Sequence, residues 1–141
     1  MSTETLIPDD ADLRSLLAAA KTIAVVGLSS KPGRDSNGTA RYLQRAGYRI
    51  IPVNPNEGEV LGERAYSSLL DVPERVDIVD VFRRSPSTPP VARDAVRAGA
   101  KVLWLQEGIF NDEARRIGEE GGLTVVMGVC LHLTIERLRG G

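Results

Sequence analysis

Short apolar runs alternate with helical patterns along the chain. The runs that predict strands are rich in β-branched residues and cover 22–27, 48–53, 76–82, 101–106 and 123–128. Helical patterns separate these runs, at 13–20, 37–46, 91–99, within 107–122 and at 133–139, with a short helix within 66–73. Strands with so little polar alternation are buried on both faces of a sheet. The sequence therefore predicts an α/β fold, a Rossmann-like doubly wound parallel sheet of about five strands flanked by helices.

Two features predict where one helix begins and where the chain is irregular. Ser36 or Asn37 is the expected N-cap of the helix at 37–46, because short polar side chains cap orphan backbone N–H groups. Three prolines fall within residues 86–90. Proline lacks a backbone N–H, so we expect 83–90 to be an irregular loop.

Composition narrows the class of protein. The 141 residues suit one domain, 1–141, with a loose N-terminus at 1–9. The net charge of −1 gives no basic field for nucleic acid. No basic-then-apolar leader and no membrane-length apolar run is present, so we expect a cytoplasmic protein that does not bind membranes. A single cysteine, Cys130, and a single histidine, His132, exclude an intrachain disulfide and most metal and triad schemes.

Ligands of doubly wound sheets bind at the carboxyl ends of the strands, which selects four loops, at 27–38, 53–58, 82–88 and 106–111. The first loop joins a strand to a helix N-terminus, where backbone N–H groups favour an anion. Its candidate contacts are a glycine for the turn, serine donors and two cations: Gly27, Ser29, Ser30, Lys31 and Arg34. The alternative is an ordinary strand–helix turn with solvated charges.

Standard nucleotide motifs do not fit this loop. The dinucleotide fingerprint G-x-G-x-x-G has Ser29 and Pro32 in place of its second and third glycines. It also expects an acid near the end of the second strand, where this chain has Asn54-Pro55-Asn56. A Walker-type loop would need G-K-[ST], which is absent from the chain. An NAD(P)-binding redox protein is therefore disfavoured but stays an alternative.

The later loops add polar groups at the same predicted edge. Arg83 and Arg84 follow the third strand and suit bidentate contact with phosphate, although two exposed arginines at an edge would look the same. The fourth loop begins at Gln106, and Trp104 before it is expected in the core.

Four segments together resemble a known family: IAVVGLSSKPGRDSNGTARYLQRAGYRIIPVNPN, VDIVDVFRR, GAKVLWLQEGI and GLTVVMGVC. The chain resembles the stand-alone CoA-binding proteins related to the N-terminal domain of the succinyl-CoA synthetase α subunit. The resemblance implies a nucleotide-binding, Rossmann-like domain with coenzyme A at the strand ends. Carried over by position, the implied contacts are Gly27, Leu28, Ser29, Ser30, Lys31, Arg34, Val53, Asn54, Pro55, Phe82, Arg83, Arg84, Gln106, Glu107 and Gly108.

No residues form a nucleophile, base and orienter together. His132 is expected to be a surface or packing residue without a carboxylate partner, and Cys130 a small buried hydrophobe. A mixed disulfide between Cys130 and a bound CoA thiol is the alternative. The leading hypothesis is a module that binds CoA or acyl-CoA, as a sensor or for a protein partner, without catalysis of its own. An enzyme acting on an acyl-CoA or nucleotide-linked substrate is the alternative.

Overall fold

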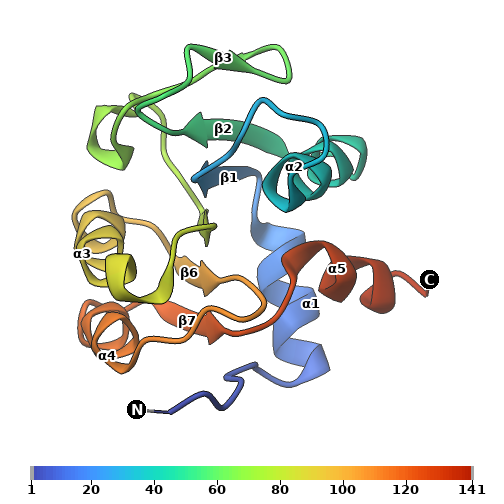
Figure 1. The fold of residues 1–141 in the computed structure, drawn as a ribbon. Helices are drawn as coiled ribbons and strands as arrows, with labels where there is room; N and C mark the ends of the chain where they lie inside the picture. The colour runs from blue at the N-terminus through green and yellow to red at the C-terminus, as the bar shows by residue number, and fades with distance from the viewer. Residues whose placement is uncertain (1, 141) are drawn as a thin grey trace.

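A parallel sheet between two layers of helices forms the centre of the computed structural model, which describes residues 2–140. The sheet strands are β1 (Thr22–Val26), β2 (Arg49–Val53), β5 (Ile78–Val81), β6 (Val102–Leu105) and β7 (Thr124–Met127). The helices are α1 (Asp10–Ala19), α2 (Asp35–Arg45), α3 (Thr88–Arg97), α4 (Asp112–Glu120) and α5 (Leu131–Leu138) (Figure 1). Short elements complete the described chain, namely a hairpin of β3 (Glu59–Val60) and β4 (Glu63–Arg64) and 3₁₀ turns at Leu69–Asp71 and Ser85–Ser87. The predicted Rossmann-like α/β fold is confirmed.

The order of the strands determines where a ligand can enter. The sheet runs β2-β1-β5-β6-β7, and every neighbouring pair is parallel. The chain moves outward from β1 to β2, then returns to the other side of β1 to place β5. The strand order therefore reverses between β1 and β5. In doubly wound sheets the crevice at this reversal, outside the carboxyl ends of the strands, is the usual ligand position.

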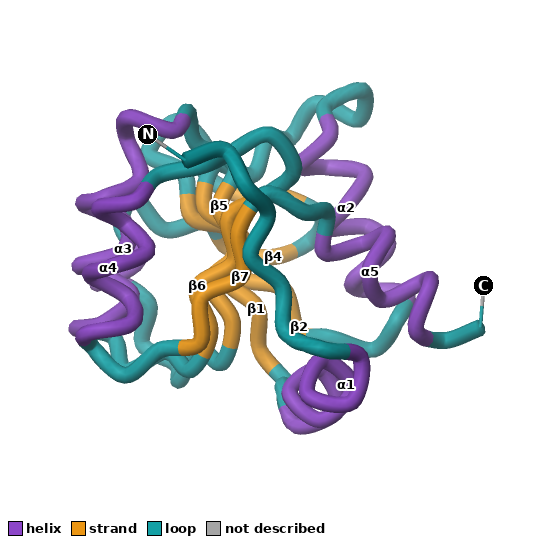
Figure 2. Tube along the Cα trace, turned by 90° about the horizontal axis from the view of Figure 1, so that it is seen from below, coloured by secondary structure: helices purple, strands orange, loops and turns teal. Residues whose placement is uncertain are grey.

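The two faces of the sheet have separate apolar cores. Figure 2 shows α3 and α4 on one side of the sheet and α1, α2 and α5 on the other. Side chains alternate along a strand, so Val79 and Val81 of β5 pack in the α3/α4 cluster, whereas Ile78 packs in the opposite one. Trp104 has no exposed surface and belongs to the second cluster, which confirms its expected core position.

Four helices start earlier than the sequence predicts: α1 at Asp10, α2 at Asp35, α3 at Thr88 and α5 at Leu131. Helix α2 begins at Asp35 after Arg34, and Ser36 accepts a hydrogen bond from the Ser29 N–H instead of capping the helix. The 83–90 segment is also more regular than expected. A 3₁₀ turn covers Ser85–Ser87, and α3 begins at Thr88 with two prolines in its first turn. The first turn of a helix has no intrahelical acceptors for its N–H groups, so proline is tolerated there.

Both edges of the sheet are partly covered. Leu6 and Met127 exchange backbone hydrogen bonds of 2.9 and 2.8 Å at the β7 edge. At the β2 edge, Tyr66 donates its backbone N–H to Pro52 and accepts from Asn54. The N-terminal segment predicted to be loose therefore contacts the sheet at Leu6. The ends of the predicted domain, at 1 and 141, lie outside the described residues.

Candidate functional site

The loops after β1 and β5 meet closely at the reversal of strand order. Gly27 has a φ of 91°, in the left-handed region that favours glycine. A Cβ at this position would lie 2.2 Å from the backbone oxygen of Phe82. Glycine is therefore required here by both conformation and space, and it allows the two loops to form one continuous rim.

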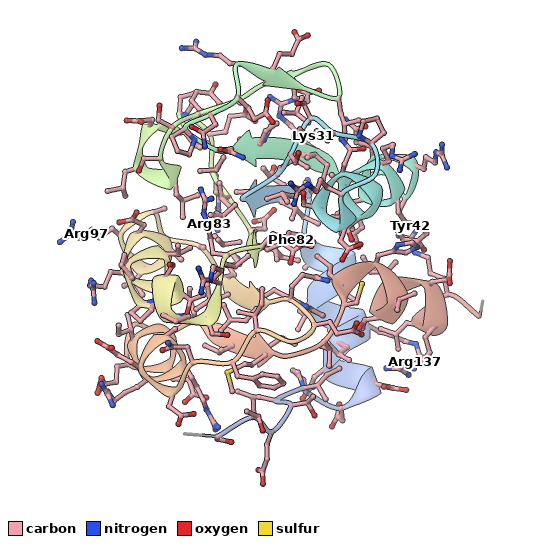
Figure 3. The ribbon with its side chains drawn as sticks, in the orientation of Figure 1. Lys31, Tyr42, Phe82, Arg83, Arg97 and Arg137 are labelled. Carbon is pink, nitrogen blue, oxygen red and sulfur yellow. The ribbon has the colours of Figure 1, made fainter. Side chains whose placement is uncertain are left out.

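A cavity of about 1020 Å³ opens beside this rim. Its walls come from the end of the loop after β1, α2, the loops after β5 and β6, and the start of α5. The lining residues are Pro32, Gly33, Arg34, Asp35, Gly38, Thr39, Arg41, Tyr42, Arg45, Phe82, Arg83, Arg84, Gln106, Glu107, Ile109, Cys130, His132 and Leu133. In Figure 3, Phe82 and Arg83 lie near the middle of the view, with Tyr42 on α2 to their right.

The charge of the cavity wall is strongly positive. Five arginines line it against two carboxylates, Asp35 and Glu107. The ion pairs among residues 2–140 use none of these arginines, and only the His132–Glu136 pair involves a lining residue. One of the five, Arg41, donates to the backbone oxygen of Pro32 at 3.3 Å. Guanidinium groups in this arrangement can bind several phosphate oxygens at once.

The structure brings together six of the predicted contacts. They line the cavity and are Arg34, Phe82, Arg83, Arg84, Gln106 and Glu107. The other predicted contacts lie outside its lining and are Gly27, Leu28, Ser29, Ser30, Lys31, Val53, Asn54, Pro55 and Gly108. Leu28 has no exposed surface, so its side chain cannot reach a ligand in this conformation.

Hydrogen bonds within the chain hold the first part of the loop after β1, which lies outside the lining, whereas Pro32, Gly33 and Arg34 of the same loop line the cavity. Leu28 accepts a bond of 3.0 Å from the Asn54 amide at its backbone oxygen, and Gly27 donates to the Val53 oxygen at 2.8 Å. The Ser30 N–H donates to the Glu57 carboxylate at 2.8 Å. The loop after β2 therefore clamps the loop after β1 and takes up some of its backbone donors.

An aromatic pair forms part of the cavity wall. The rings of Tyr42 and His132 stack with centroids 3.8 Å apart and planes inclined by 21°. His132 Nε2 also lies 3.5 Å from a Glu136 oxygen, so the expectation of no carboxylate partner is wrong. Residue Glu136 is one helical turn further along α5, and this spacing is visible in the sequence.

Cys130 differs from its expected role. It lies at the start of α5, is half-buried and lines the cavity, so the prediction of a buried hydrophobe is wrong. Beside it, Gln106 Oε1 accepts the Leu131 N–H at 3.1 Å. Gln106 is 5% exposed, so the cavity floor and the first turn of α5 are held together by a nearly buried amide.

A buried carboxyl group lies in the sheet near the site. Asp80 of β5 sits between Val25 and Trp104 in the strand register and has no exposed surface. Among the described residues, neither of its oxygens has a hydrogen-bond partner. Burial in the apolar interior raises the pKa of Asp80 well above the usual aspartate range. Burial therefore favours the neutral form of the carboxyl group, which belongs to the core and not to the cavity lining.

The residues that α2 contributes to the cavity wall were not predicted from the sequence. Arg41, Tyr42 and Arg45 line the cavity, and the two arginines are one helical turn apart. The sequence itself shows that Arg41 and Arg45 are spaced to lie on the same face of a helix. The direction in which that face points depends on how α2 packs against α5, which local pattern does not specify.

Two further classes of site find no support in residues 2–140. No group of His, Cys, Asp and Glu side chains there is arranged to hold a metal ion. None of the helices described is both long and apolar enough to span a bilayer.

Comparison with known proteins reveals several similar chains. An uncharacterized protein of Bacillus subtilis is 45% identical over 126 residues, which cover 89% of this chain and 93% of that protein. A hypothetical protein from Pyrococcus horikoshii has a solved structure with a TM-score of 0.93 and 40% identity, and the match covers 99% of both chains.

A longer enzyme shares part of its sequence with this chain. The ADP-forming acetate–CoA ligase II of Archaeoglobus fulgidus is 31% identical over 112 residues. The match covers 78% of this chain and 16% of the ligase, so the chain spans only a small part of that enzyme.

A family model described as a CoA binding domain matches residues 21–136, which include both loops of the rim, α2 and most of α5. The match confirms the resemblance on which the sequence prediction rests. The chain belongs to this family of CoA-binding domains.

Proposed function

We propose that the protein binds coenzyme A or an acyl-CoA in the cavity at the carboxyl ends of the strands, as a binding or sensor module without catalysis of its own. The observation that carries this proposal is the group of five arginines around one cavity of about 1020 Å³. The cavity also lies where the strand order reverses, the position that doubly wound sheets use for nucleotide ligands.

The chemistry of coenzyme A matches this wall. It carries a pyrophosphate and a phosphate on its ribose, and arginine binds phosphate through paired N–H donors. Arg34 and Arg41 on one side and Arg83 and Arg84 on the other are the proposed phosphate contacts. Four positive groups exceed what a dinucleotide with a single pyrophosphate needs.

The remaining lining residues suit the uncharged arm of the ligand. Ile109, Leu133 and the Tyr42–His132 pair offer apolar and aromatic surface, and Gln106 and Glu107 offer polar groups beside it. We propose that the pantetheine arm lies against this part of the cavity. Phe82 packs partly in the core and closes the inner side.

We also propose that the protein has no catalysis of its own. His132 is engaged by the Tyr42 ring and lies beside Glu136, and Asp80 is sealed within the sheet. These groups do not form a set in which a base activates a nucleophile and a third group orients the base. A protein partner that supplies chemistry is compatible with this role.

Calorimetric titration with CoA, dephospho-CoA and NAD tests the choice of ligand. We expect CoA to bind and dephospho-CoA to bind more weakly by about 1.5–3 kcal/mol, the range for a charge-assisted phosphate contact. We also expect acetyl-CoA to remain intact during incubation with the protein. Binding of NAD without CoA would contradict the ligand assignment, and hydrolysis or transfer of the acetyl group would contradict the absence of catalysis.

A further inference from the structure

A carboxylate lies against the loop after β1, although the sequence shows no acid at the end of β2 itself. The chain leaves β2 at Val53 and turns over residues 54–57, where Asn54 Oδ1 accepts the Asn56 N–H and the Asn54 backbone oxygen accepts the Glu57 N–H. This turn directs the Glu57 side chain back to the first loop. Its Oε2 accepts the Ser30 N–H at 2.8 Å.

The Ser30 N–H is the kind of donor that a phosphate group uses. It belongs to the loop between a strand and a helix N-terminus, where backbone N–H groups and nearby cations favour an anion. The neighbouring donors have neutral acceptors, since the Ser29 N–H bonds the Ser36 hydroxyl and the Lys31 N–H bonds the Ser29 hydroxyl. Among these three backbone donors, the Ser30 N–H is therefore the one that is hydrogen-bonded to a charged group.

The hydrogen bond between Glu57 and the Ser30 N–H can be replaced by one to a ligand, unlike the buried hydrogen bond between Asn54 and Leu28. The Asn54 amide bonds the Leu28 oxygen where both residues are buried, so this bond is part of the fold. Ser30 is exposed and Glu57 is half-buried. Rotation of the Glu57 side chain would expose the Ser30 N–H to solvent without breaking the clamp.

We propose that the Glu57 carboxylate competes with a ligand phosphate for the Ser30 N–H and so determines how tightly phosphate-bearing ligands bind. Ser30 lies outside the cavity lining but only two residues before Pro32, where the lining begins. A phosphate that extends from the cavity to the Ser30 N–H meets the charge of Glu57 and must displace it. Glutamine at the same position would remove the charge, while its amide oxygen could accept the same hydrogen bond. The inference rests on the proposed CoA-binding function and adds a specificity-determining residue to it.

The test compares Glu57→Gln with wild type by calorimetric titration with CoA and with dephospho-CoA. We expect CoA to bind the variant about three- to tenfold more tightly, because a charged competitor is replaced by a neutral one. A gain for CoA alone assigns the ribose phosphate to Ser30, and an equal gain for both compounds assigns the pyrophosphate. Glu59→Gln is the matched control, because Glu59 is exposed in β3 and should leave both affinities unchanged.

A second measurement follows the donor directly. The Ser30 amide resonance should shift in wild type when CoA is added, and it should shift at lower CoA concentration in Glu57→Gln. An affinity of Glu57→Gln for CoA that is equal to or weaker than that of wild type would overturn the inference and leave CoA binding intact. If neither protein binds CoA or dephospho-CoA, the proposed function fails and the role of Glu57 fails with it.

Discussion

At the scale of single residues, Gly27 carries the closest backbone approach at the site. Its positive φ and its distance to Phe82 both exclude a side chain. The sequence indicates a glycine turn after the first strand. The sequence does not indicate that glycine is needed there because the backbone of Phe82, more than fifty residues later, lies so close. That contact depends on β1 and β5 being neighbours in the sheet.

We therefore expect Gly27→Ala to lower the free energy of unfolding by at least about 2 kcal/mol, through left-handed backbone strain and the clash with Phe82. Chemical denaturation measures this change. Gly33→Ala is the control, because nothing lies within 4 Å of a Cβ there and its φ is not positive. It should change stability by less than about 0.5 kcal/mol. Equal effects of the two substitutions would show that the contact between the loops is not constraining.

We expect the buried Asp80 carboxyl to make stability depend on pH. Its pKa in the folded protein is raised by burial, so the folded state binds a proton that the unfolded state has released above the ordinary aspartate pKa. The stabilisation is fully present below the unfolded pKa and is lost as pH rises through the folded pKa. Between the pKa of Asp80 in the unfolded protein and its pKa in the folded protein, the free energy of unfolding should fall by about 1.4 kcal/mol per pH unit.

Asp80→Asn removes this titration and keeps the shape of the side chain. Denaturation at several pH values should show that the stability of the variant relative to wild type increases as pH rises above about 4. Asp71→Asn is the control, since Asp71 is exposed. A difference between Asp80→Asn and wild type that stays constant with pH would mean that Asp80 does not hold a proton.

At the scale of elements, the apolar pattern predicts every strand of the main sheet, because buried parallel strands leave a clear signature. Helix starts are predicted less well. Ser36 resembles an N-cap, but a contact with Ser29 uses its hydroxyl. The prolines of α3 look like breakers, but they occupy the first turn, where the missing N–H costs little. In each case the deciding factor is the position of the residue within its element.

Tertiary contacts also decide which site residues the sequence can reveal. Arg83 and Arg84 directly follow a strand, so the rule for strand ends finds them. Arg41 and Arg45 lie inside a helix, and their face is fixed by the packing of α2 beside α5. The role of Glu57 depends on a hydrogen bond to Ser30, twenty-seven positions earlier in the chain. Local pattern contains no information about either arrangement.

At the scale of the whole molecule, the sheet order gathers charges that are far apart in the sequence. Arg34 and Arg41 come from the side of β1, and Arg83 and Arg84 from the end of β5. These groups share one cavity because the chain crosses from one side of β1 to the other at the reversal of strand order. The net charge of −1 conceals this local field, because the acidic residues other than Asp35 and Glu107 lie outside the cavity lining.

We propose that the arginines gathered around the cavity bind coenzyme A. The most direct test is a calorimetric titration of CoA into wild type, Arg83→Ala/Arg84→Ala and Arg97→Ala/Arg116→Ala. The last variant removes the same charge from α3 and α4, outside the cavity, and Figure 3 shows Arg97 away from Arg83 at the far side of α3. We expect the first variant to lose about 1.5–3 kcal/mol of binding free energy and the second to bind within about twofold of wild type. Equal weakening of both variants, or wild-type affinity in Arg83→Ala/Arg84→Ala, would contradict the claim.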